Sequence, residues 1–219
     1  MNASDMTSGE SLSGVRVLIT GATGGLARSM ADGVAQVVDD LGGLDVLVNN
    51  AGIGMRTVNP EFFTRPRGFW EVTPDGFRDV VDTNLTGYFL VARAVVPVFL
   101  DAGGGRIVTI SVSKETMIRR GFTPYGPSRA GSEALSSIMA ADLREHSVWV
   151  NVLLPGGATR SGMIPDGVPE DVRAQMLALP SWPGRFAGCC SPAADGVTDE
   201  RIVARDFDEW LRTRQTGCR

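Results

Sequence analysis

Five short runs of apolar residues recur along the chain, and each is apolar throughout rather than at every second position. Between them lie stretches with the spacing of amphipathic helices, chiefly Pro74–Ala102 and Tyr125–Glu145. Strands that are apolar throughout have both faces buried, and strands that alternate with helices form parallel sheets. The sequence therefore predicts an α/β fold, a doubly wound and mostly parallel sheet of about five strands with helices on both faces. The runs are VRVLIT from Val15, LDVLVNN from Leu44, RIVTIS from Arg106, VWVNVLL from Val148 and RIVA from Arg201.

The length of the chain, 219 residues, permits one domain with a sizeable core. We expect a single domain over residues 13–207, preceded by a flexible segment over residues 1–12 and followed by a tail over residues 208–219. The stretch 157–192 is rich in glycine and proline, so we expect loop or lid there rather than core.

Composition excludes several classes of function. The net charge is −4 without a basic cluster, so we expect neither nucleic acid nor an anionic membrane as a partner. The first ten residues lack the pattern of a signal peptide and no apolar stretch is expected to reach the length of a membrane span, which favours a cytoplasmic protein. The three cysteines, Cys189, Cys190 and Cys218, have no metal-site spacing, and with a single histidine we expect reduced thiols and no metal.

Polar and glycine-rich motifs follow the carboxyl ends of the expected strands, where ligands bind in such sheets. In order, they are TGATGGLA at Thr20–Ala27, NNAG at Asn49–Gly52, DTNLTG around Asn84, ISVS at Ile110–Ser113, Tyr125 in YGPSR, and PGG from Pro155. Together they resemble the short-chain dehydrogenase/reductase family from about residue 12 to residue 205. The resemblance implies a Rossmann-like fold and an oxidoreductase that interconverts an alcohol and a carbonyl with NAD or NADP.

The resemblance also implies roles for single residues. In the family a tyrosine is the acid or base, a serine holds the substrate oxygen, a lysine binds the nicotinamide ribose, and an asparagine positions a water. These roles would fall on Tyr125, on Ser113 or Ser111, on Arg129 and on Asn84. The family commonly has its serine thirteen residues before the tyrosine, where this chain has Val112. Both flanking serines lie on one face if the strand continues, and we favour Ser113 because it is nearer the substrate loop.

Arg129 stands where the family has lysine, in a chain with a single lysine among 21 basic residues. An arginine keeps the positive charge, so it can lower the pKa of a neighbouring phenol. It stays protonated at any working pH, so it cannot relay a proton as lysine can. Tyr125 and Arg129 are four residues apart at an expected helix start, so we expect them to stack one turn apart. The alternative is an exposed tyrosine near a surface arginine.

The cofactor contacts implied by the resemblance come from three places. The glycine-rich loop would approach the pyrophosphate, whose charge a helix N-terminus favours, although a tight strand-to-helix turn alone would also explain its glycines. The NNAG loop would leave room for the cofactor, and the segment after the fourth expected strand would complete the site. The residues are Gly21, Thr23, Gly25, Leu26, Asn50, Ala51, Gly52, Tyr125, Arg129, Pro155, Gly156 and Thr159.

The interval between the first two motifs is short. From Gly21 to Asn49 there are 28 positions (49 − 21), which is room for one crossover of about thirty residues, whereas the family has three. We therefore expect two strands to be missing and the family's first and fourth strands to pair directly. A right-handed crossover would then place the connecting helix on the face opposite the family's first helix. The missing segments carry the adenosine contacts in the family, so NAD and NADP cannot be told apart.

Two functions from different classes fit these patterns. The first is a working or weakened oxidoreductase that acts on a small alcohol or ketone through Tyr125. The second is a non-catalytic remnant that keeps the fold and an oligomer surface. The helices at Pro74–Ala102 and Tyr125–Glu145 correspond to elements that commonly pack between subunits in the family, so we expect a homo-oligomer, a dimer or tetramer.

Overall fold

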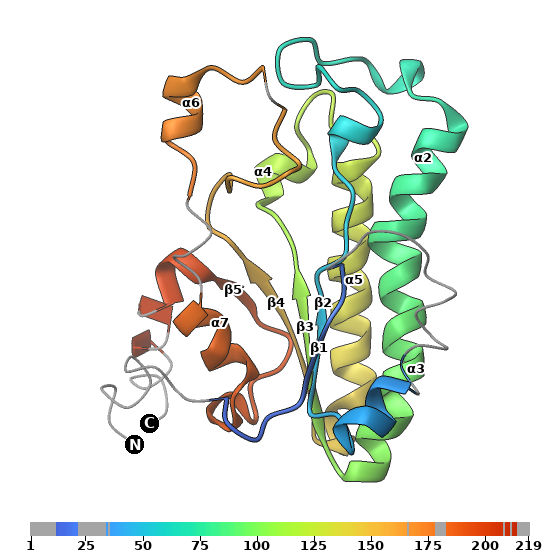
Figure 1. Cartoon of the computed structure of the whole chain (residues 1–219), viewed down its shortest axis with the longest axis vertical. Coiled ribbons are helices and arrows are strands. Elements are labelled where there is room, and N and C mark those ends of the chain that lie inside the picture. The colour runs from blue at the N-terminus through green and yellow to red at the C-terminus, as the bar shows by residue number, and fades with distance from the viewer. Residues whose placement is uncertain are drawn as a thin grey trace.

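The computed structural model describes residues 12–21, 34, 36–165, 167–177, 183–207, 209–210 and 212–213. Within them, five strands form one sheet in chain order, and all neighbouring pairs are parallel (Figure 1). Each strand falls inside an expected apolar run or extends beyond it by one residue, so the predicted α/β fold is confirmed. The strands are β1 Val17–Ile19, β2 Val46–Asn49, β3 Gly105–Ile110, β4 Val148–Leu154 and β5 Arg201–Val203.

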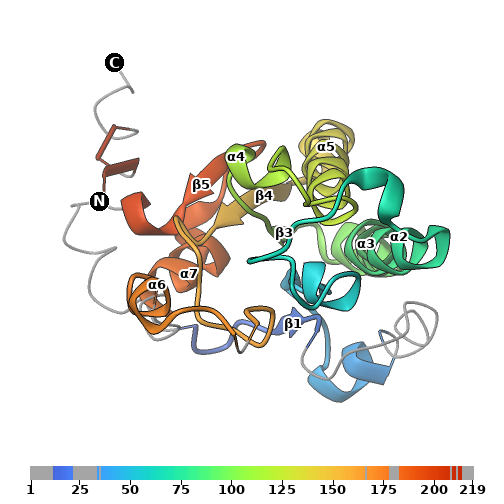
Figure 2. The same ribbon diagram turned by 90° about the horizontal axis from the view of Figure 1, so that it is seen from above.

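Helices cover both faces of this sheet. The helices α2, α3 and α5 lie on one face, and α7 lies on the other (Figures 1 and 2). A π-helical turn over Asp82–Thr86 joins α2 to α3. The helices are α2 Pro74–Val81, α3 Gly87–Ala102, α4 Lys114–Met117, α5 Tyr125–Leu143, α6 Glu170–Ala174 and α7 Pro183–Cys190. Short 3₁₀ turns occur at Met55–Thr57, Phe69–Glu71, Arg144–His146, Pro192–Ala194 and Ala204–Asp206.

Two apolar clusters bury the two faces of the sheet. On the α3 and α5 face, Leu47 and Ile107 from the strands pack against Val95 and Phe99 of α3. On the other face, Val48 and Val108 pack with residues of the C-terminal part, among them Cys190 and Phe207. Alternate residues of the central strands therefore serve opposite cores, which is why these strands are apolar throughout.

The segment between β1 and β2 reaches the α3 and α5 face. Val34 and Val38 join the cluster on that face, and residues 36–41 are helical. The first three crossovers thus place helices on the same side while the strands advance in one direction, as expected for crossovers of one hand.

β1 lies at the edge of the described sheet. Its three residues pair with Val46, Leu47 and Val48 of β2, which confirms the expected direct pairing of these strands. Ile19 is 48% exposed, whereas its register partner Val48 is 1% exposed. At the opposite end of the pair, the Arg16 guanidinium donates to both carboxylate oxygens of Asp45 at 2.9 and 2.7 Å. β1 is held to the sheet through contacts with β2 and its flanking residues.

The expectation of loop or lid over residues 157–192 is wrong in part. The stretch 157–192 includes α7, whose Cys189 and Cys190 are 4% and 0% exposed within the core. Burial raises the pKa of each thiol to about 12, so both are protonated near neutral pH. Cys218 lies outside the described residues. Glycine and proline occur at the ends of core helices as well as in loops, so their abundance in this stretch did not exclude a helix.

The stretch Pro74–Ala102 corrects the expectation about membrane spans. It is 29 residues long, and an 18-residue window of it reaches a mean hydropathy of 1.5, so it is long and apolar enough to cross a membrane by length and composition alone. Its inward side chains, such as Val95 and Phe99, belong to the sheet core. A single helix of this kind is weak evidence for a span, because the core helix of a soluble protein passes the same test.

Candidate active site

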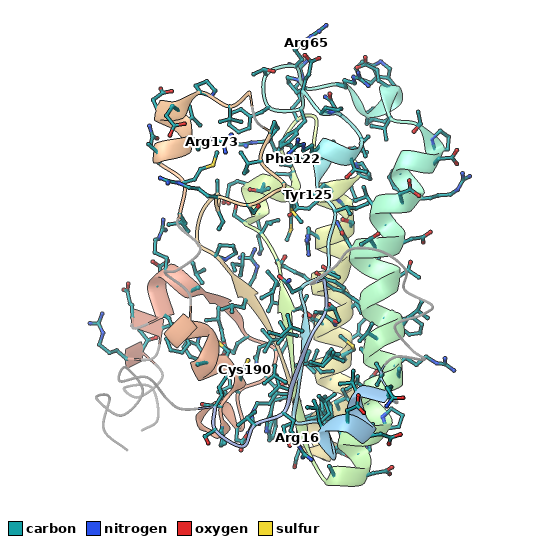
Figure 3. The ribbon with its side chains drawn as sticks, in the orientation of Figure 1. Arg16, Arg65, Phe122, Tyr125, Arg173 and Cys190 are labelled. Carbon is teal, nitrogen blue, oxygen red and sulfur yellow. The ribbon has the colours of Figure 1, made fainter. Side chains whose placement is uncertain are left out.

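The expected pair at the start of α5 is buried. Tyr125 is the first residue of the helix and Arg129 lies one turn further on, at 9% and 3% exposure. The Arg129 Cζ atom lies 5.2 Å from the centroid of the Tyr125 ring. Figure 3 shows Tyr125 beyond the upper ends of the strands, next to Phe122. The alternative of an exposed tyrosine near a surface arginine is therefore wrong.

The guanidinium of Arg129 is held by oxygen atoms that carry no formal charge. Its Nη1 atom donates to the Tyr88 hydroxyl at 2.7 Å and to the Ile110 carbonyl at 3.0 Å. In the part of the chain that the structure describes, no carboxylate forms a salt bridge with it. Burial disfavours its charge, but interactions with Tyr88 and Tyr125 outweigh that effect and raise the pKa of Arg129 above its ordinary value. A permanent cation thus lies beside both phenols.

Asn84 connects three elements of the site. It sits in the π-helical turn between α2 and α3 and is fully buried. Its Oδ1 accepts from the Ile53 backbone N–H at 2.9 Å, and its Nδ2 donates to the Ile53 carbonyl at 3.0 Å and to Ser128 Oγ at 3.1 Å. Asn84 therefore joins the loop after β2 to the first turn of α5.

The NNAG loop lies between these groups and β1. A Cβ atom on Gly52 would lie 2.4 Å from Arg129 Nη2 and 3.2 Å from Asn84 Oδ1, so only glycine fits without a shift. On the other side of the loop, Thr20 Oγ1 accepts from the backbone N–H groups of Asn50 and Ala51, both at 3.1 Å. The loop is thereby fixed from both sides.

Gly21 lies against the same loop. Its φ angle of +95° belongs to the left-handed region, and a Cβ there would lie 2.5 Å from the Ala51 Cα. Glycine is required at this position for both reasons. The other expected residues of the glycine-rich loop, Thr23, Gly25 and Leu26, lie outside the described residues.

The two candidate serines have different surroundings. β3 ends at Ile110, and the exposed Ser113 is the N-cap of α4, where its Oγ accepts from the Thr116 N–H at 3.2 Å. The assumption that the strand continues through both serines is therefore wrong. Ser111 is 1% exposed, and its hydroxyl has no hydrogen-bond partner among the residues that the structure describes. The side chain that packs into the apolar cluster with Tyr125 and Phe122 is Val112.

The segment after β4 forms a flap near the NNAG loop. Gly156 has a φ angle of +93°, and Pro155 precedes it at the end of β4. The flap closes on itself where Thr159 pairs with Leu177, whose N–H donates to the Ala158 carbonyl at 2.8 Å. Met163 of the flap lies in contact range of Gly54, next to the expected cofactor loop.

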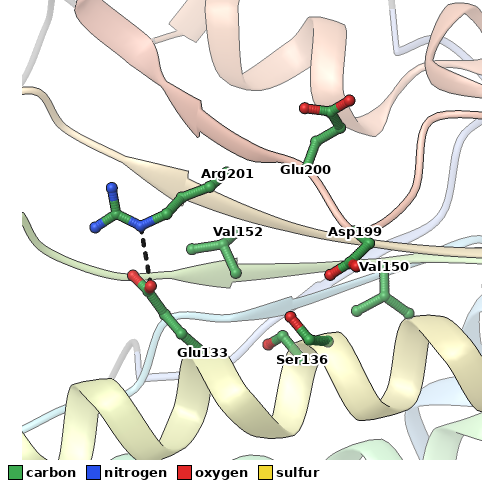
Figure 4. A pocket seen from close by; sticks show the side chains of 8 residues that line it. Glu133, Ser136, Val150, Val152, Asp199, Glu200 and Arg201 are labelled. Carbon is green, nitrogen blue, oxygen red and sulfur yellow. Dashed lines mark hydrogen bonds and ion pairs between the residues drawn. The ribbon is translucent and has the colours of Figure 1, made fainter.

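A small pocket lies further along α5, between that helix and the start of β5 (Figure 4). Its volume is about 50 Å³, whereas pockets for drug-sized ligands reach several hundred Å³. Arg201 donates from Nε to Glu133 Oε2 at 2.9 Å beside it, and from Nη2 to the Val112 carbonyl at 2.7 Å. The pocket is too small for a nicotinamide, but its ion pair fixes the backbone of the β3–α4 loop near Tyr125.

Sequence reasoning missed one contributor to this site. Tyr88 was not singled out, although its hydroxyl accepts a hydrogen bond from Arg129 at 2.7 Å. The sequence offered one signal for it, which is that Tyr88 and Tyr125 are the two tyrosines of the chain. Asn49 of the NNAG motif, which is expected to brace the sheet, is fully buried at the end of β2, and neither end of its amide has a hydrogen-bond partner among the described residues.

Comparison with known proteins gives relatives of one kind. A family model described as short chain dehydrogenase matches residues 27–167. An acetoacetyl-CoA reductase from Rhizobium meliloti (strain 1021) is 35% identical over 129 residues, which are 59% of this chain and 49% of the relative. A gluconate 5-dehydrogenase from Gluconobacter oxydans (strain 621H) is 34% identical over 128 residues, 58% of this chain and 46% of the relative. The chain spans about half the length of these relatives.

Solved structures agree with the sequence match. A short-chain type dehydrogenase/reductase from Mycobacterium marinum has a TM-score of 0.68 at 26% identity, covering 81% of this chain and 70% of that chain. A 3-ketoacyl-(acyl-carrier-protein) reductase from Brucella melitensis, solved with NADH, has the same fold at a TM-score of 0.69 and 22% identity, covering 81% of this chain and 72% of that chain. Because the family match extends over residues 27–167 of 219, the chain belongs to the short-chain dehydrogenase family.

Proposed function

We propose that the protein is an oxidoreductase that interconverts a small alcohol and a carbonyl compound with NAD or NADP, and that Tyr125 is its acid/base. The observation that carries this proposal is the buried pair of Tyr125 and Arg129 beside Gly52. A phenol next to a fixed cation can lose and regain a proton more easily than an isolated one. Membership of a dehydrogenase family supports the same reaction class.

The residues on the nicotinamide side fit a cofactor. Gly21 and Gly52 keep the loops after β1 and β2 free of side chains, and Asn84 fixes the second loop from behind. When bound, the nicotinamide would accept or supply the hydride. Asn50, Ala51, Gly52, Pro155, Gly156 and Thr159 would contact it from the loops, and Thr23, Gly25 and Leu26 would contact the pyrophosphate.

Within this reaction, the protein's own groups handle the proton and the substrate oxygen. Tyr125 would donate its phenolic proton to a carbonyl oxygen in reduction, or accept the hydroxyl proton in oxidation. Arg129 would stabilise the phenolate form by its charge. Ser113 is the proposed holder of the substrate oxygen and Ser111 is the alternative. Replacing each by alanine separates them, since only the true holder should raise KM and lower kcat together.

Binding of the reduced cofactors tests the proposal. Titrating the protein with NADH and with NADPH, followed by nicotinamide fluorescence, should give saturation with at least one of them. Absence of binding by both at millimolar concentration would reject the enzyme reading. An Arg129→Lys variant should bind the same cofactor and turn over faster, because lysine can relay a proton.

A second candidate function is a non-catalytic protein that keeps the fold and forms homo-oligomers in the cytoplasm. The observation that favours it is the outer surface of the two long helices, where Phe89 of α3 and Ile138 of α5 are 47% and 59% exposed. Light scattering of Ile138→Asp against wild type checks it. A dimer or tetramer that dissociates in the variant supports this surface, and a wild-type monomer excludes it.

A further inference from the structure

Arg129 contacts both tyrosines of the chain, although they come from different helices. Tyr88 lies on α3 and Tyr125 begins α5. The Arg129 Cζ atom is 5.8 Å from the Tyr88 ring centroid and 5.2 Å from the Tyr125 ring centroid. All three side chains are at most 9% exposed, so bulk water does not screen the charge between them.

The orientation of a guanidinium depends on its acceptors, because its donors form a rigid planar fork. Here the Nη1 atom is shared between the Tyr88 hydroxyl at 2.7 Å and the Ile110 carbonyl at 3.0 Å, while Nε has no hydrogen-bond partner in the described part of the chain. Among the described residues, the Tyr88 hydroxyl accepts a hydrogen bond from this guanidinium at 2.7 Å, and a side-chain hydrogen bond with Tyr125 adds to the hold on its charge. Burial raises the pKa of Tyr88, which keeps its phenol neutral and leaves it as an acceptor for the arginine.

We propose that Tyr88 is a positioning residue, whose hydroxyl holds the Arg129 guanidinium against Tyr125 and thereby sets how readily Tyr125 gives or takes a proton. The inference rests on the proposed acid/base function of Tyr125. It also accounts for a buried arginine that has no carboxylate partner among the described residues, because the two phenols take the place of that partner.

The two-tyrosine composition allows a direct test. In protein labelled with ¹³C at the hydroxyl-bearing ring carbon of tyrosine, NMR should show two signals, and the signal that remains in Tyr88→Phe belongs to Tyr125. We expect the chemical shift of that signal at neutral pH to change in Tyr88→Phe, because the guanidinium 5.2 Å from the centroid of the Tyr125 ring is then less fixed. We expect kcat to fall roughly tenfold with KM little changed, a part of the 10²–10⁴-fold contribution of acid/base catalysis.

A matched control removes a different buried hydroxyl, which lies on α5 itself. Ser136 is 2% exposed, and its Oγ donates to Thr109 Oγ1 at 2.8 Å. Ser136→Ala should leave both tyrosine signals and kcat in place. If Tyr88 acts through the guanidinium, Tyr88→Phe should have a much smaller effect in an Arg129→Lys background than in wild type.

The outcomes separate this inference from the proposed function. If the Tyr125 signal in Tyr88→Phe keeps its chemical shift at neutral pH, the positioning role is overturned, even where turnover is present. If the signal moves but the wild type neither binds nicotinamide nor turns over, the positioning role stands and the enzymatic proposal fails. Equal effects of Tyr88→Phe in wild type and in Arg129→Lys would also overturn it, because they would show a general loss of packing.

Discussion

The ends of β2 and β3 and the end of β1 are held in different ways. Beside β2 and β3, Asn84 and Arg129 are buried and hydrogen-bonded to groups from three elements. β1 has three residues and one neighbour in the described sheet, and Ile19 at its end is 48% exposed. Acid/base groups need rigid surroundings to stay within reach of a substrate. The region at the ends of β2 and β3 provides such surroundings. The comparison indicates that the proposed acid/base residues are held more firmly by packing and hydrogen bonds than β1, the strand that leads to the expected phosphate loop.

The largest expected effect is at the centre of the well-packed region. Tyr125→Phe keeps the ring that packs on Arg129 but removes the hydroxyl that we propose to be the acid/base, so turnover should fall by at least about a hundredfold. The dissociation constant for NADH or NADPH should change little. Steady-state kinetics and fluorescence titration check the two parts. An active phenylalanine variant would show that another group is the acid/base.

A glycine pair tests how tightly that region is packed. Gly52→Ala places a methyl group 2.4 Å from Arg129 Nη2, so we expect the free energy of unfolding to fall by about 1–3 kcal/mol. Gly162 has open space where its Cβ would lie, so Gly162→Ala should change that free energy by less than about 0.5 kcal/mol. Urea denaturation measures both. Equal effects would mean that the loop yields and that the site is not rigid.

A register pair tests the difference between β1 and β2 directly. Val48→Thr buries a hydroxyl at a position 1% exposed, so it should destabilise the fold by about 1–3 kcal/mol. Ile19→Thr alters its register partner, which is 48% exposed, so its cost should be clearly smaller. Thermal or urea unfolding of the two variants gives the comparison. A larger effect at Ile19 would indicate that the edge strand is covered.

The smallest expected effect concerns pH and the base of β1. Hydrogen bonds from Arg16 hold the pKa of Asp45 below its ordinary value. A lowered folded-state pKa contributes stability that is present above the unfolded pKa of about 4 and is lost as pH falls through the folded value. The pair is partly exposed, so the contribution should be small. Urea unfolding from pH 7 to pH 3 should show a shallower decline in Asp45→Asn than in wild type, and parallel curves would contradict the assignment.

The positions of the strands were predictable because each apolar run is a local pattern. Asn84 was also predictable as a special position, because an amide is disfavoured inside a helix, and it lies in a π-helical turn with three hydrogen bonds. The surroundings of Ser111 and Ser113 could not be predicted, because they depend on β3 ending at Ile110. A shift of one residue in a strand end changes which side chain faces the site.

From the sequence by itself, the α/β class, the strand order of a short sheet and the resemblance to a dehydrogenase family follow, because periodicity and contiguous motifs are local properties of the chain. Only the tertiary structure decided which side chains meet. Tyr88 and Arg129 are 41 positions apart, and their contact depends on how α3 and α5 lie against the sheet. Val112, rather than a serine, packs with Tyr125 for the same reason, since the path of the chain after β3 is set by packing and by the α4 cap.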